Sequence, residues 1–169
     1  MWEKKSIDVI IFRGFGGQVF STGMDRLSEK IQNIHKVKCV HIRGYESWAS
    51  VPAPDPKTNT VLIGHSFGAL AAYKIVSTYP DINFPLVVTF DYSPYYSGIV
   101  GLPPKGIVPK NVKYALNFYQ KVDPLVRGMV LNTDGHGGVE NIERNLAHVE
   151  IDKSEELHQI TIDRIKKYA

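Results

Sequence analysis

The feature that most constrains this chain is the segment Gly64–Gly68, which reads Gly-His-Ser-Phe-Gly, together with its two flanks. The preceding residues 60–63 are an apolar run with β-branched members, which predicts a short buried strand. The following residues are rich in alanine up to Pro80, which predicts a helix over about 67–79. A strand that enters a helix through so short a turn favours an architecture in which helices pack on a sheet.

The residue types in this turn agree with a sharp reversal at Ser66. Such a turn lifts the serine Oγ clear of the sheet and places strain on the serine backbone. The strand and the helix then approach so closely that only very small residues fit two positions away, where Gly64 and Gly68 stand. The N–H of Phe67 would lie at the positive end of the helix dipole, where an anion is stabilised.

The rest of the chain alternates between apolar runs and amphipathic stretches. The expected strands span residues 7–12, 37–42, 60–63, 86–90, 112–119 and 139–144, and the expected helices span residues 22–33, 67–79 and a last segment after residue 154. Ser21 and Ser154 are the expected helix caps. This order predicts an α/β three-layer sandwich, with a mostly parallel sheet of about five or six strands and helices on both faces. Residues 1–169 are expected to form one domain.

Composition excludes several classes of function. The chain has a formal net charge of +3, and its basic residues are scattered, so no nucleic-acid partner is expected. It contains no apolar run near the roughly 20 residues that span a bilayer, so no stable membrane insertion is expected. The single cysteine, Cys39, cannot form an intrachain disulfide and reads as a small packed residue, which favours a cytoplasmic location. The oligomeric state is left open.

With these residues in view, the chain resembles the α/β-hydrolase superfamily, and within it compact lipase- or esterase-like members without a cap domain. The resemblance runs from Ile7 to the last helix, and its most specific motif is Gly64–Gly68. It implies two backbone N–H donors to an oxyanion, from Phe67 and from the loop after the first strand. That loop reads Arg13-Gly14-Phe15 where the family often has His-Gly-x, so Phe15 is the implied second donor.

A serine nucleophile requires a base, and the base requires an acid that orients it. The resemblance implies the chain order serine, acid, histidine. Three histidines follow Ser66: His136 in a glycine-rich turn, His148 just before the last helix, and His158 within that helix. The superfamily places its histidine where His148 stands, so His148 is favoured.

Two aspartates compete to be the acid. Asp91 directly follows the buried strand 86–90 and would be held rigidly there. Asp123 follows the next strand by about four residues, in an Asp-Pro pair that is also common in turns. We favour Asp91, with Asp123 open. The tyrosines of the loop after Asp91 (92, 95 and 96) are expected either to rim the pocket or to pack within the loop.

The resulting hypothesis is a serine hydrolase that cleaves carboxylic ester or thioester bonds of a small acyl substrate through an acyl-enzyme. It requires no metal and no organic cofactor. A dinucleotide site is disfavoured because Val19 stands where the third glycine is needed. The alternatives are a non-catalytic binding module of the same fold and, less favoured, a metal enzyme using Asp134, His136 and His148, whose spacing matches no known ligand pattern.

Overall fold

The computed structural model describes residues 5–93 and 106–169. Within them, six parallel strands form one sheet in the order β2-β1-β3-β4-β6-β8. The strands are β1 (Ile7–Arg13), β2 (Val37–Gly44), β3 (Asn59–His65), β4 (Leu86–Phe90), β6 (Tyr114–Tyr119) and β8 (Gly138–Glu143). The helices are α1 (Thr22–Ile31), α2 (Phe67–Thr78), α4 (His148–Ile151) and α5 (Glu155–Lys166).

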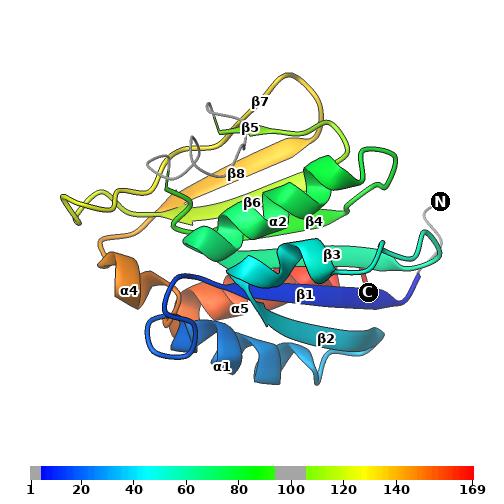
Figure 1. Ribbon diagram of the computed structural model, residues 1–169, viewed down its shortest axis with the longest axis horizontal. Coiled ribbons are helices and arrows are strands. Elements are labelled where there is room, and N and C mark those ends of the chain that lie inside the picture. The colour runs from blue at the N-terminus through cyan, green and yellow to red at the C-terminus, as the bar shows by residue number, and fades with distance from the viewer. Residues whose placement is uncertain (1–4, 94–105) are drawn as a thin grey trace.

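The helices lie on both faces of the sheet (Figure 1). Side chains alternate along β1, so Ile10 and Phe12 pack in the core beneath α2, whereas Val9 and Ile11 pack with α1 and α5 on the other face. All four are almost fully buried, as expected for a strand covered on both sides. The predicted three-layer α/β sandwich with a parallel sheet is confirmed.

Most element boundaries agree with the sequence to within one or two residues. The structure adds features that periodicity did not predict: a 3-10 helix at Tyr45–Ser50, the short helix α4, and a separate pair of strands, β5 (Ile107–Val108) and β7 (Asn132–Thr133). Of the two helix caps expected from the sequence, one forms its hydrogen bond and the other does not. The Ser154 hydroxyl accepts the Leu157 N–H as expected, but the Ser21 hydroxyl makes no capping bond to α1.

Parallel strands bring their carboxyl ends to one edge of the sheet, which is the edge where ligands bind in open α/β folds. From β1 the chain crosses to β2 on one side, and then to β3 on the other. Ser66 follows β3, Asp91 follows β4, and the glycine-rich loop 14–20 follows β1. Helix α4 lies at the same side of the molecule (Figure 1). No helix among the described residues has both the length and the apolar character needed to cross a membrane.

Candidate active site

Ser66 occupies the sharp turn between β3 and α2. Its backbone lies at φ 56° and ψ −121°, in the left-handed range that a residue with a side chain seldom adopts. The two glycines permit the close approach. A Cβ on Gly64 would lie 2.2 Å from the carbonyl oxygen of Gly68, and a Cβ on Gly68 would lie 2.1 Å from that of Phe12. The predicted reason for these glycines is confirmed.

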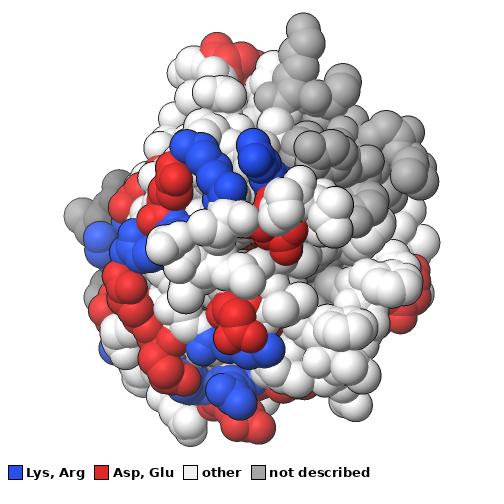
Figure 2. Space-filling view, turned by 90° about the vertical axis from the view of Figure 1, so that its left-hand side faces the viewer, with Lys and Arg blue, Asp and Glu red and all other residues white. Residues whose placement is uncertain are grey.

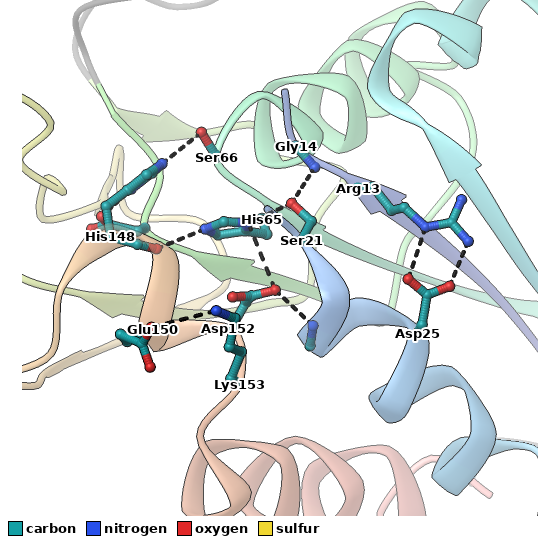
Figure 3. A network of polar contacts seen from close by, with 12 residues as sticks. Arg13, Gly14, Ser21, Asp25, His65, Ser66, His148, Glu150, Asp152 and Lys153 are labelled. Carbon is teal, nitrogen blue, oxygen red and sulfur yellow. Dashed lines mark hydrogen bonds and ion pairs between the residues drawn. The ribbon is translucent and has the colours of Figure 1, made fainter. Parts of the chain in front are cut away.

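The side chains of Ser66, His148 and Asp91 form one hydrogen-bonded row. His148 Nε2 lies 2.9 Å from Ser66 Oγ, and His148 Nδ1 lies 2.5 Å from Asp91 Oδ2 (Figure 3 shows the first of these contacts). With Nδ1 donating to the carboxylate, Nε2 of the neutral ring accepts the serine proton. Three segments far apart in the sequence therefore meet at distances that permit proton transfer.

Asp91 is fully buried and held from several sides. The backbone N–H of Gln120 donates to Asp91 Oδ1 at 3.2 Å, and Gln120 Nε2 donates to Asp91 Oδ2 at 2.8 Å. A Cβ on Gly128 would lie only 2.0 Å from Asp91 Oδ1, so the chain also packs tightly against this carboxylate. Sequence reasoning did not identify Gln120, because it lies in a loop and matches no motif.

The competing residues lie elsewhere. Asp123 accepts the backbone N–H groups of Leu125 (3.0 Å) and Val126 (3.2 Å), as a turn aspartate does. His136 is exposed, and its carbonyl accepts a hydrogen bond from the Thr133 hydroxyl. Neither side chain contacts Ser66 or His148 in the hydrogen bonds and ion pairs of the described residues.

The structure also places the third downstream histidine, His158, and the first tyrosine of the loop after Asp91, Tyr92. His158 is fully buried and its Nε2 lies 2.6 Å from the carbonyl oxygen of Asp152, so it is a packed residue of α5. Tyr92 does not rim the site: it is 2% exposed and packs edge-on against Tyr73 in the core, with ring centroids 5.7 Å apart. Residues 95 and 96 lie outside the described part of the chain.

The loop after β1 lies directly against the Ser66 turn. A Cβ on Gly14 would lie 3.0 Å from Ser66 Cβ and 2.8 Å from the carbonyl oxygen of His65. Phe15 follows in this loop, and Phe67 is the first residue of α2. Their rings approach each other, with centroids 6.3 Å apart. The two residues predicted to donate to an oxyanion thus flank Ser66 from opposite segments.

An apolar cavity of about 250 Å³ lies beside Ser66. Its walls are the aromatic or branched side chains of four segments, namely Phe15, Phe20, Phe67, Val126 and Val149, with His65, Ser66 and His148 completing the lining. Figure 2 views the molecule from the side on which this edge lies, and shows mostly white, uncharged residues in the lower right-hand part of that face. The cavity can therefore take an apolar group next to the serine hydroxyl.

His65, inside the motif, is 2% exposed and lies beneath His148, with ring centroids 4.9 Å apart. Its Nδ1 contacts Ser21 Oγ at 2.7 Å and its Nε2 contacts the carbonyl oxygen of His148 at 3.0 Å. Burial, and then the nearby His148, lower the pKa of His65 to about 3, so its ring is neutral at ordinary pH. In the residues that the structure describes, no group of three or more metal-ligating side chains is placed to hold a metal ion.

Comparisons with known proteins identify the fold. No protein-family model matches the chain, and no curated protein matches its sequence. Among solved structures, it is similar to ClbQ from the colibactin NRPS/PKS pathway, with a TM-score of 0.51, 11% identity and coverage of 96% of both chains. It is also similar to RedJ, a thioesterase of the prodiginine biosynthetic pathway in Streptomyces coelicolor, with a TM-score of 0.50 and 12% identity over 96% of this chain and 85% of that one.

These similarities show a shared fold and correct one sequence-based expectation. The resemblance to compact lipases and esterases is wrong at that level, because the fold that this chain shares is that of a thioesterase. The thioesterase fold lies within the α/β-hydrolase superfamily, so the wider resemblance is consistent with the comparison. The motif misled because the turn around a nucleophilic serine is common to many branches of this superfamily.

Proposed function

We propose that this protein is a serine hydrolase that cleaves thioester or carboxylic ester bonds through an acyl-enzyme. The observation that carries this proposal is the row of Ser66, His148 and Asp91, with contacts of 2.9 and 2.5 Å at the C-terminal edge of the sheet. The fold shared with the thioesterase RedJ favours a thioester as the substrate. The apolar cavity beside Ser66 favours an uncharged, apolar acyl group.

The reaction follows from the positions of these groups. Ser66 Oγ attacks the acyl carbon while its proton passes to His148 Nε2, and the carbonyl oxygen becomes an oxyanion that the N–H groups of Phe15 and Phe67 stabilise. The carbon–sulfur or carbon–oxygen bond then breaks, and the leaving group takes the proton from His148. A water molecule then attacks the acyl-enzyme ester and gives a proton to His148. The bond to Ser66 Oγ breaks, His148 returns the proton to Ser66, and the carboxylic acid is released. Asp91 orients His148 and stabilises its charged form.

Covalent labelling of the native protein with a fluorophosphonate probe tests the proposal. We expect labelling of the wild type, none in Ser66→Ala, and full labelling in the matched control Ser50→Ala, because Ser50 is an exposed serine whose hydroxyl bonds only the local backbone. Absence of labelling in folded wild-type protein would refute the proposal and leave the non-catalytic module.

A substrate panel then defines the reaction. Acetyl, hexanoyl and decanoyl thioesters of a simple thiol are compared with the matching p-nitrophenyl esters. Because a buried methylene contributes roughly 0.8 kcal/mol, we expect kcat/KM to rise from acetyl to hexanoyl by up to about fourfold for each methylene that enters the cavity. A preference for acetyl would exclude the cavity as the acyl site.

A further inference from the structure

A second hydrogen-bonded chain lies behind Ser66, separate from the row that includes Asp91. The N–H of Gly14 donates to Ser21 Oγ at 2.9 Å, Ser21 Oγ lies 2.7 Å from His65 Nδ1, and His65 Nε2 lies 3.0 Å from the carbonyl oxygen of His148. Figure 3 shows these contacts in sequence, from the β1–α1 loop to the start of α4. The side chains of Ser21 and His65 are almost fully buried.

Chemistry determines the direction of each bond in this chain. A carbonyl oxygen only accepts, so His65 Nε2 carries a proton and donates a hydrogen bond to the backbone carbonyl oxygen of His148. In a neutral ring Nδ1 then accepts, so the Ser21 hydroxyl donates to it and its oxygen accepts from Gly14. Burial keeps the pKa of His65 far below its ordinary value, which is consistent with a neutral ring.

The chain joins the three segments on which the proposed reaction depends. Gly14 precedes Phe15 in the loop 14–20 after β1, which is called the oxyanion loop below. His65 precedes Ser66, and the carbonyl at the far end belongs to His148. His148 is the first residue of a helix of only four residues, which offers little rigidity of its own. Ser21 supplies independent support, because it stands at the N-cap of α1 and yet its hydroxyl serves this chain rather than the helix.

We propose that His65 and Ser21 are positioning residues that hold the oxyanion loop and His148 in register with Ser66. This inference rests on the proposed hydrolase function and adds residues to its machinery. Neither side chain touches the reacting atoms; each acts through the backbone of a residue that does. A shift of the order of 1 Å in a reacting group is enough to cost about 100-fold in rate.

The neutral state of His65 is also part of this arrangement. His148 becomes an imidazolium during the reaction, and the His65 ring lies 4.9 Å from it, so a cation at His65 would oppose that charge. The other ionisable groups that face His65 are Asp152, whose Oδ2 lies 3.9 Å from Nδ1, and Lys153, which lowers the pKa of His65 further. Both lie just after α4.

The test compares two substitutions of His65. In His65→Gln, one terminal amide supplies both a donor and an acceptor, whereas His65→Phe fills the space and supplies neither. We expect His65→Phe to lower kcat for the hexanoyl thioester by about 10- to 100-fold with KM within about threefold, and His65→Gln to recover most of that loss. His35→Phe, on an exposed histidine, serves as the matched control.

A double-mutant comparison of Ser21 and His65 separates a positioning role from a general loss of stability. Either Ser21→Ala or His65→Phe interrupts the same chain, so we expect the double variant to lose no more than about twofold beyond the worse single variant. The melting temperature of each variant is measured, and rates are compared well below the lowest one. Full kcat in His65→Phe, equal losses in the Phe and Gln variants, or fully additive losses would each overturn the proposal.

A second readout does not require activity. Nitrogen chemical shifts of the His65 ring report its tautomer, and we expect a neutral ring with the proton on Nε2 throughout pH 5–8. A proton on Nδ1, or protonation near pH 6, would overturn the hydrogen-bonded chain itself. If the fluorophosphonate probe does not label the wild-type protein but the His65 tautomer is as expected, the hydrolase function is refuted and the positioning role with it. The row of hydrogen bonds through Ser21 and His65 would still be shown to exist.

Discussion

Two buried aspartates lie at the same edge of the sheet, and their surroundings differ. Both oxygens of Asp91 have partners: the backbone N–H and side-chain amide of Gln120, and the His148 ring. Asp152 receives the Gly23 N–H on Oδ2 at 3.0 Å, but its Oδ1 is buried with no hydrogen-bond partner. Burial above all raises the pKa of Asp152 to about 7. Burial without a hydrogen-bond partner for each carboxyl oxygen therefore favours the protonated form of Asp152.

The largest expected effect comes from replacing the Asp91 carboxyl group that contacts His148. In Asp91→Asn the amide no longer selects the His148 tautomer that accepts the serine proton, and we expect kcat to fall by about 10⁴-fold. The matched control is Asp123→Asn, which changes an aspartate in a backbone turn and should retain activity within about twofold. Steady-state kinetics on the hexanoyl thioester provide the measurement. A comparable loss in the Asp123 variant would make Asp123 the acid.

A smaller effect should follow from weakening the support of Asp91. Gln120→Leu keeps the backbone donor but removes the amide that lies 2.8 Å from Asp91 Oδ2. Because the partner of a buried polar group is lost, we expect the free energy of unfolding to fall by about 1–3 kcal/mol, together with a fall in kcat. Urea unfolding measures the first quantity. Unchanged stability and activity would show that His148 and the backbone alone suffice.

The smallest expected effect concerns Asp152 and depends on pH. Because its pKa is raised in the folded protein, the native state holds a proton that the unfolded chain releases above about pH 4. The free energy of unfolding should therefore fall as the pH rises from about 4 to about 7, and this contribution should level off above that. In Asp152→Asn, which keeps an acceptor for Gly23 N–H, that part of the decline should disappear.

The measurement is urea unfolding of both proteins at pH 5, 6, 7 and 8. Between pH 5 and pH 8, the free energy of unfolding of the wild type should fall more than that of Asp152→Asn, by on the order of 1 kcal/mol. Parallel pH profiles of the two proteins would show that Asp152 does not carry this dependence and would remove the contrast with Asp91.

The sequence alone determined the features that depend on local interactions. The turn at Ser66 could be predicted because a strand, two glycines and an alanine-rich helix follow one another directly, and their steric requirements extend over a few residues. The alternation of apolar runs likewise predicted a parallel sheet covered on both faces. Asp91 was favoured from its place directly after a buried strand and His148 from the resemblance to the superfamily, and both side chains do meet in space beside Ser66.

Only the tertiary structure decided which distant groups become partners. Gln120 supports Asp91, and Ser21 bonds across 44 residues to His65 instead of capping its own helix. Tyr92 turned inward to Tyr73 because a buried ring gains more from core packing than from a place at the rim. A local pattern reports the conformation of a segment, whereas hydrogen-bond partners and the pKa of a buried carboxylate such as Asp152 depend on what the other segments bring to it.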